Sequence, residues 1–209
     1  MHGSVPRKLV RLGWSLALHP RYAWRYLLRG PWSPRSPLEL GIPWFSEAAI
    51  DFLEGYLAAG MTAFEWGAGG STVYLAARTG AVTSVENDAA WIARVRERLA
   101  REGQGHVEFL HRPYDFAAAT AFEDSAYLHA IDGRTADVIV VDGAEENVQV
   151  RPRCFYLAER HVRPGGIIVV DDAWRYPELR ERTRARMRRT FQSTGPCRPG
   201  VTSTDVHFY

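Results

Sequence analysis

Acidic side chains follow four separate apolar runs of this 209-residue chain. Glu65, Glu86, Asp142 and the pair Asp171 and Asp172 each stand at the end of a short stretch rich in Val, Ile, Ala or Phe. If these stretches are parallel strands, their ends meet at one edge of an open α/β sheet, where such sheets bind ligands. Several carboxylates in one cleft repel one another unless cations or hydrogen-bond donors compensate. The pattern therefore predicts a site for a ligand that carries positive charge.

Glycines follow the first of these acids in the segment 64–72, which has the sequence Phe-Glu-Trp-Gly-Ala-Gly-Gly-Ser-Thr. Gly67 and Gly69 suit a tight turn from a strand into a helix, in which backbone N–H groups can approach a ligand. The next apolar run, Ala81–Glu86, ends in a carboxylate that can accept two hydrogen bonds from ribose hydroxyls. Asn87 or the residue after it is expected to cap the following helix. Together these features predict a nucleoside site.

A dinucleotide-binding turn has a similar geometry, and the third glycine of the G-x-G-x-x-G pattern distinguishes the two kinds of site. Counted from Gly67, that position falls on Thr72, so the dehydrogenase fingerprint fails. With Glu65 before the glycines and Gly-Gly-Ser-Thr at their end, the segment instead resembles motif I of the class I S-adenosylmethionine-dependent methyltransferases. The order of motifs from Glu65 to Asp172, with Pro-Gly-Gly at residues 164–166, resembles the same family.

The resemblance covers about residues 46–209 and implies an α/β fold. In this family a doubly wound, mostly parallel seven-stranded sheet has an antiparallel last strand and helices on both faces. The cofactor would be S-adenosylmethionine, bound by the glycine loop, by the strand ends and by residues after the third strand. The binding residues implied are Glu65, Gly67, Ala68, Gly69, Ser71, Thr72, Glu86, Asn87, Pro113, Tyr114 and Asp142.

A second resemblance concerns three of the acids. Asp142 with Asp171 and Asp172 resembles the acidic trio with which catechol O-methyltransferase and related metal-dependent O-methyltransferases hold magnesium. Mg²⁺ prefers oxygen ligands, and it would lower the pKa of a bound hydroxyl and orient it toward the methyl group. The alternative is that Asp142 lies beside the cofactor or substrate while the Asp pair only orients the following loop.

The candidates for catalysis follow the fourth strand. Asp142 would lie where methyl donor and acceptor meet. The metal-dependent enzymes commonly have a lysine shortly after this aspartate, whereas residues 143–147 are Gly-Ala-Glu-Glu-Asn. Glu145 is therefore the candidate general base, His111 is its rival, and Arg151 is a candidate for orienting an anionic substrate.

The elements that must position these residues alternate between strand-like runs and helical periodicities from residue 46 onward, as in a doubly wound sheet. The expected strands are Thr62–Glu65, Ala81–Glu86, Val107–Leu110, Ala136–Asp142 and Gly166–Asp171, and Val201–Tyr209 resembles the antiparallel final hairpin of the family. The expected helices are Glu47–Ala59 with Ser46 as its cap, Thr72–Arg78, Ala89–Glu102, Ala117–His129, Arg153–Val162 and Tyr176–Phe191.

Residues 1–45 are expected to form a basic helical segment followed by a Pro-rich linker, with the methyltransferase domain in residues 46–209. One face of a short helix would carry Val5, Leu9, Leu12 and Leu16. Seven basic residues and three tryptophans precede Glu39, which is the first acid of the chain. Residues 1–35 can therefore either pack across their own domain or lie on an anionic membrane surface or a partner.

Composition restricts the class of protein. The length and the apolar content of 46% fit one globular domain with an appended segment. A net charge of +2 gives no reason to expect nucleic acid as a partner. Cys154 and Cys197 give neither a disulfide framework nor a metal-ligand spacing, and no long apolar run is present, so a cytoplasmic protein is expected, with peripheral membrane contact as an alternative. The sequence carries no signal for an oligomeric state.

Together these features predict an S-adenosylmethionine-dependent methyltransferase that acts on an oxygen, with nitrogen as the alternative, of a small-molecule or sugar-type acceptor. Mg²⁺ is an optional second cofactor in this hypothesis. The rival hypothesis is a methyltransferase-like scaffold that has lost turnover and binds a membrane or a partner through residues 1–35. The retained glycines and acids favour the enzyme.

Overall fold

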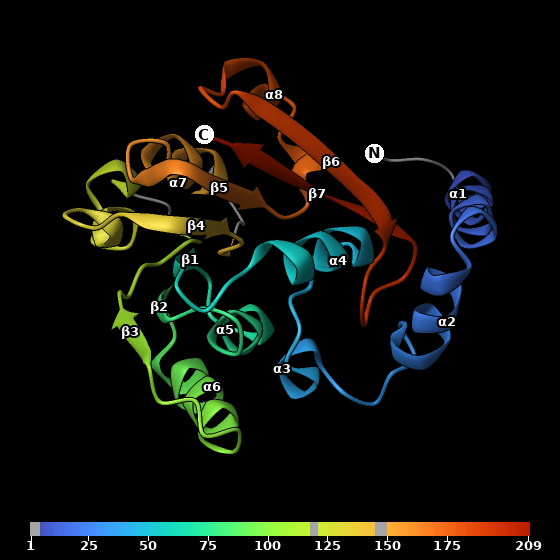
Figure 1. Cartoon of the computed structure of the whole chain (residues 1–209), viewed down its shortest axis with the longest axis horizontal. Helices are drawn as coiled ribbons and strands as arrows, with labels where there is room; N and C mark the ends of the chain where they lie inside the picture. Colours follow the sequence, from blue (N-terminus) through green and yellow to red (C-terminus); the bar gives the residue numbers. More distant parts are fainter. Residues whose placement is uncertain (1–4, 118–120, 145–149) are drawn as a thin grey trace.

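The computed structural model describes residues 5–117, 121–144 and 150–209, and a twisted sheet of seven strands forms its centre (Figure 1). The strand order is β3-β2-β1-β4-β5-β7-β6. The strands are β1 (Thr62–Trp66), β2 (Ala81–Glu86), β3 (Val107–His111), β4 (Ala136–Val141), β5 (Val162–Val170), β6 (Met187–Thr194) and β7 (Val201–Phe208). Strands β1 to β5 pair in parallel, whereas β7 runs antiparallel to both β5 and β6. The predicted fold class is confirmed.

Helices cover both faces of the sheet (Figure 1). One face packs against α3 (Pro37–Leu40), α4 (Glu47–Tyr56), α5 (Gly70–Ala76) and α6 (Ala89–Ala100), and the other against α7 (Val150–Ala158), α8 (Glu178–Arg182) and the 3₁₀ turns η1 (Phe122–Asp124), η2 (Leu128–Ile131) and η3 (Ala173–Arg175). Successive residues of β4 alternate between the two cores, with Val138 and Val140 on one side and Ile139 and Val141 on the other. Such continuous apolar runs are typical of strands that are buried on both faces.

The start of α4 shows how the first helix of the predicted domain is fixed to the sheet. Ser46 caps it, as predicted, by accepting the N–H of Ala49 at 3.3 Å. The Ser46 hydroxyl donates to the carbonyl of Phe191 on β6, and its N–H donates to Thr204 on β7, both at 3.0 Å. The cap therefore also ties α4 to the C-terminal hairpin.

The predicted helix Tyr176–Phe191 is wrong, because the structure divides this segment between the five-residue helix α8 and strand β6. The helix ends before Thr183, whose backbone is extended. Strand β6 pairs with β7 over its whole length. Arg180 and Arg188 both reach the buried carboxylate of Asp205 on β7, at 2.8 and 3.6 Å. Pairing with β7, together with the contact from Arg188 within β6, favours a strand over the helix that the local composition suggested.

The predicted helix Ala117–His129 is also wrong for the residues that the structure describes, since only the two short 3₁₀ turns η1 and η2 form there; residues 118–120 lie outside the described part. Phe116, Phe122 and Tyr127 are buried together, with ring centroids of Phe116 and Tyr127 5.2 Å apart. Tyr127 also accepts, through its carbonyl, the indole N–H of Trp66 at 3.0 Å. An irregular path brings these aromatic rings into one core, which a straight helix would not do.

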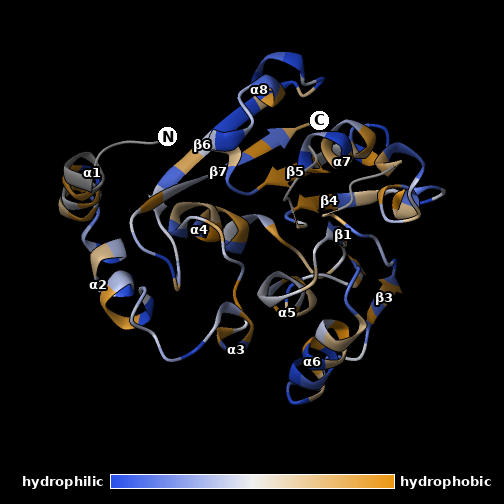
Figure 2. Cartoon of the chain, turned by 180° about the vertical axis from the view of Figure 1, so that it is seen from behind, coloured by the Kyte–Doolittle hydropathy of each residue, from blue (hydrophilic) through white to orange (hydrophobic). Residues whose placement is uncertain are grey.

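Two further helices, α1 (Val5–Leu18) and α2 (Pro20–Arg29), lie beside the β6–β7 edge, apart from the helices that cover the sheet (Figures 1 and 2). Helix α2 docks through two buried tyrosines and through three arginines that pair with acids of α4. The division of the chain at residue 45 stays a prediction. None of the helices in the described ranges is long and apolar enough to cross a membrane.

Candidate active site

The glycine loop turns the chain from β1 into α5 at the carboxyl edge of the sheet. Gly67 has φ of +97°, and a Cβ there would lie 2.8 Å from the carbonyl oxygen of Asp142, so only glycine fits without strain. Gly69 differs, because its backbone is extended and no heavy atom lies within 4 Å of a Cβ placed on it. The loop therefore packs tightly against β4 at its start and faces open space at Gly69.

Glu65 holds this loop from below. Its fully buried carboxylate accepts the hydroxyls of Ser71 at 2.7 Å and Thr72 at 2.5 Å, and Thr72 in turn accepts the N–H of Gly69 at 2.8 Å. Burial raises the pKa of Glu65 to about 7, against the lowering effect of these hydroxyls. Neither Glu65 nor Thr72 lines the cavity above the loop, so both shape the loop rather than its surface.

Glu86, the predicted ribose ligand, is also engaged by the protein. Its Oε1 accepts the N–H groups of Asn87 and Asp88 at 2.7 and 3.1 Å, and its Oε2 accepts the N–H of Ala68 at 3.2 Å. Burial raises its pKa. The indole of Trp91 donates to the carbonyl of Ala68 at 2.7 Å, so the loop is fixed by β2 and α6 at once.

A cavity of about 330 Å³, which we call the glycine-loop cavity, opens above these residues. Of the predicted cofactor ligands it contains Gly67, Ala68, Gly69, Ser71, Glu86, Asn87 and Asp142. The other lining residues are Ser36, Pro37, Leu38, Trp44, Gly70, Trp91, Gly143, Ala144 and Arg151. The sequence did not predict that residues 36–44 line this cavity. A Pro-rich stretch does not indicate which part of the fold it will pack against.

Pro113 and Tyr114, predicted to lie beside adenine, are not among the residues that line this cavity. Pro113 is exposed. The Tyr114 ring packs edge-on against Phe116 and Phe122, with centroids 5.0 and 5.1 Å apart. His111 is exposed and its ring contacts the carbonyl of Asn87. Their roles in binding or catalysis stay predictions.

Arg151 of α7 organises the end of β4. Its guanidinium lies 2.9 Å from Oδ1 of Asp142 and donates to the carbonyls of Gly143 and Asp171, both at 3.0 Å. Burial raises the pKa of Asp142, and the neighbouring guanidinium opposes this. Arg151 therefore joins the ends of β4 and β5, and its role in orienting an anionic substrate stays a prediction. Glu145, the predicted general base, lies outside the described residues.

Arg198, in the connection between β6 and β7, neutralises the end of β5. It lies 3.2 Å from both carboxylate oxygens of Asp172 and 3.5 Å from Oδ2 of Asp171. Thr204 donates to Asp171, and Thr202 to Asp172. Burial and the charges of the neighbouring acids raise the pKa of Asp171 to about 8. Burial also acts on Asp172, but the guanidinium and the Thr202 hydroxyl outweigh it and hold its pKa below the usual value.

These contacts do not fit the predicted magnesium site at Asp142, Asp171 and Asp172. Two guanidinium groups already pair with the three carboxylates, and Asp171 turns one oxygen toward Thr204. In the described part of the chain, no three His, Cys, Asp or Glu side chains form a group that could hold a metal. Arginine side chains thus supply the positive charge that compensates these acids. The catalytic roles proposed below therefore involve no metal ion.

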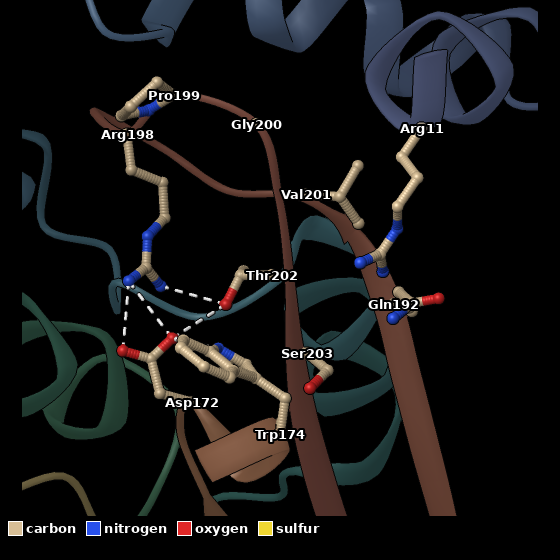
Figure 3. Close-up of a pocket in the computed structure, with 10 residues that line it drawn as sticks. All are labelled: Arg11, Asp172, Trp174, Gln192, Arg198, Pro199, Gly200, Val201, Thr202 and Ser203. Carbon is tan, nitrogen blue, oxygen red and sulfur yellow. Dashed lines mark hydrogen bonds and ion pairs between the residues drawn. The ribbon is translucent and has the colours of Figure 1, made fainter. Parts of the chain in front are cut away.

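A second cavity, of about 320 Å³, lies beside this acidic edge (Figure 3). We call it the Arg198 pocket; its lining residues are Arg11, Asp172, Trp174, Gln192, Arg198, Pro199, Gly200, Val201, Thr202 and Ser203. Arg198 also donates to the carbonyl of Trp44 at 3.1 Å and its guanidinium lies 5.2 Å from the indole centroid. Because Trp44 lines the glycine-loop cavity, the pair Trp44 and Arg198 lies between the two cavities.

A family model described as a methyltransferase domain matches residues 64–173. The chain belongs to this family. The match covers more than half of the chain and includes the glycine loop and all four acidic strand ends. The prediction of a class I S-adenosylmethionine-dependent methyltransferase is confirmed. A comparison with curated protein sequences finds no match.

Solved structures similar to this chain share its fold at low identity. The O-methyltransferase TomG from Streptomyces achromogenes, solved with SAM, has a TM-score of 0.61 at 18% identity, over 94% of this chain and 97% of that one. An rRNA methylase from Streptococcus thermophilus gives 0.58 at 12%, over 84% and 98%. The N-methyltransferase NodS from Bradyrhizobium japonicum, with S-adenosylhomocysteine, gives 0.52 at 17%, over 75% and 80%. The names of these proteins indicate transfer to oxygen, to rRNA and to nitrogen, so the shared fold does not identify the acceptor.

Proposed function

We propose that the protein transfers the methyl group of S-adenosylmethionine to a hydroxyl oxygen of a small-molecule or sugar-type acceptor. The observation that carries this proposal is the place of Asp142, which lines the glycine-loop cavity and is joined through Arg151 to the end of β5, where Asp172 lines the neighbouring pocket. The donor would occupy the glycine-loop cavity and the acceptor the Arg198 pocket. Asp142 would then lie where the two meet.

The glycine-loop cavity fits the donor in shape and in charge. Gly69 faces its open space, and Oε2 of Glu86, with one N–H bound among the described residues, retains the capacity to accept a ribose hydroxyl. Arg151 pairs with Asp142, whereas among the described residues Glu86 is bound only by backbone N–H groups, so its carboxylate favours a cationic ligand. When bound, S-adenosylmethionine supplies an electrophilic methyl group on a sulfonium. The chain's own task is to hold the acceptor oxygen in line and to accept its proton.

Asp142 is the group that we assign to this proton. Arg151 binds its Oδ1, which fixes the carboxylate, and within the described residues no donor is bound to Oδ2. Burial raises the pKa of Asp142, and a higher pKa makes a carboxylate a stronger base. Similarity to TomG, which is named an O-methyltransferase and is matched over nearly the whole of both chains, supports oxygen as the acceptor atom.

The test compares binding with turnover in the wild type and Asp142→Asn. Calorimetry should show S-adenosylmethionine binding to both, because asparagine keeps the shape of the side chain. Methyl transfer to a panel of catechols, hydroxylated aromatics, sugars and an rRNA fragment is measured next. Transfer to the accepted small molecule should fall by about 10²–10⁴ in Asp142→Asn, the usual contribution of a general base. Asp124→Asn, an exposed acid on η1, is the matched control and should retain activity.

Three outcomes would contradict the proposal. Transfer only to an rRNA fragment included in the panel would replace the small-molecule acceptor by RNA. Unchanged turnover in Asp142→Asn would remove this residue from proton transfer. If S-adenosylmethionine does not bind at all, the scaffold hypothesis takes the place of the enzyme.

A further inference from the structure

Helix α1 turns its apolar side toward solvent. From residue 9 to its end, the exposed positions are Leu9, Val10, Gly13, Trp14, Ala17 and Leu18, none of which is charged. Leu9, Trp14 and Leu18 are 63%, 65% and 65% exposed. At 3.6 residues per turn these positions occupy one continuous half of the helix. The half that faces the β6–β7 edge carries Arg11 and Ser15 together with two leucines.

This arrangement is the reverse of an ordinary surface helix, which buries its apolar stripe and exposes its charges. Helix α2 shows the same reversal. Trp24, Leu27 and Leu28 are 63%, 60% and 62% exposed, while Arg25 and Arg29 turn inward to acids of α4. These inward ion pairs fix the orientation of α2 and leave its apolar residues outside.

The exposed apolar residues are concentrated in this one region. In the described chain ten large hydrophobic side chains are strongly exposed, and eight of them belong to α1, α2 and the turn after α2. They are Leu9, Val10, Trp14, Leu18, Trp24, Leu27, Leu28 and Trp32. We call these eight residues the N-terminal apolar surface. Single exposed apolar residues need no explanation, but a cluster of this kind marks an interaction site.

The charge of the region indicates what covers this surface. Residues 1–38 contain no acid, whereas seven basic residues precede Glu39. Arg21, Arg25 and Arg29 pair with acids of α4, but the side chain of Arg21 is still 67% exposed, and Arg35 is exposed as well. A second copy of the chain would bring like charge against like charge. Tryptophan with basic residues is the combination that favours the headgroup region of an anionic bilayer. We propose that the N-terminal apolar surface binds the protein to an anionic lipid membrane, lying on it rather than crossing it.

The experiment is co-sedimentation of the full chain with lipid vesicles. The protein should bind vesicles of phosphatidylcholine mixed with phosphatidylglycerol, bind pure phosphatidylcholine more weakly, and lose part of its affinity in high salt. Trp14→Ser with Trp24→Ser should lower the partition coefficient by at least about tenfold, because two large apolar side chains no longer insert. Both side chains are mostly exposed, so the melting temperature should not change.

Met187→Ser is the matched control. Met187 is 51% exposed but lies at the start of β6, at the opposite end of that strand from Gln192 near α1. Its replacement should leave vesicle binding unchanged. Absence of binding to anionic vesicles, or equal binding by the double Trp variant, would overturn the proposal. A dimer in solution that the double Trp variant dissociates would assign the surface to a second copy and would overturn it as well.

Discussion

Arg151→Met should be among the most destabilising single changes at the carboxyl edge of the sheet. The Arg151 side chain is 11% exposed and that of Asp142 19%, so their ion pair is largely shielded from water. Removing one partner of such a pair costs about 3–5 kcal/mol, because the other charge stays buried. The carbonyls of Gly143 and Asp171 also lose a charged donor, each worth about 1.5–3 kcal/mol before relaxation. Since these effects overlap, we expect a loss of about 4 kcal/mol at pH 8.

The loss should depend on pH with a defined sign. The guanidinium lowers the pKa of Asp142, which burial raises, so the pKa rises further when Arg151 is removed. A carboxyl with a raised folded pKa loses stability as the pH rises through that pKa. Arg151→Met should therefore be less destabilised, relative to wild type, at pH 5 than at pH 8, because its Asp142 is neutral in more of the folded molecules at the lower pH.

Urea unfolding followed by circular dichroism at both pH values measures this. The double variant Arg151→Met with Asp142→Asn is the control, since it removes the unpaired charge but not the loss at the two carbonyls. It should be more stable than Arg151→Met at pH 8 and should not share its pH dependence. A loss below about 1 kcal/mol at pH 8, or the same loss at both pH values, would refute the reasoning.

Other changes test the loop and its support. Gly69→Ala should weaken S-adenosylmethionine binding at least about tenfold in calorimetry without lowering stability, since its Cβ enters open space. Gly67→Ala should instead destabilise the protein by about 2 kcal/mol. The opposite result would show that the cofactor does not bind in the glycine-loop cavity. Because the pKa of Glu65 is raised to about 7, its contribution to the free energy of unfolding falls as the pH rises from 5 to 8. In urea unfolding, Glu65→Gln should therefore reduce the loss of stability between these pH values by up to about 3 kcal/mol. An unchanged loss would show that other groups cause it. Millimolar Mg²⁺ should not raise the melting temperature, because Arg198 pairs with the acids; a rise would restore the metal site.

The sequence predicted the parallel part of the fold because its signals are local. Strands β4 and β5 contain continuous apolar runs, and β1, β2, β4 and β5 each have an acid at or next to their carboxyl end. The glycine loop, Glu65 and Glu86 were found in this way, and the structure places them together at one edge. Patterns that lie within a few residues of one another can be recognised without knowing the fold.

The parts that the sequence did not predict depend on partners far along the chain. Strand β6 contains two arginines in a segment that was predicted as helix, and its pairing with β7, where Arg188 also lies 3.6 Å from the buried Asp205, could not be predicted locally. Arg198 reaches Asp172 from 26 residues away in a loop between strands. The resemblance of the three acids to a magnesium site was misleading for the same reason, because the compensating cations are arginines that no spacing connects with them.

Helix α1 connects the two sites for which we make proposals. Its outer half presents Trp14 to solvent, and its inner half supplies Arg11 to the Arg198 pocket, where the guanidinium points toward Gln192 (Figure 3). If the outer half lies on a lipid surface, the pocket lies next to that surface, within the thickness of one helix. An acceptor that resides in the membrane would then reach the pocket without crossing bulk water. The two proposals fail independently, since vesicle binding requires no turnover and methyl transfer to a soluble acceptor requires no membrane, but together they favour an acceptor with a hydroxyl near the lipid headgroups.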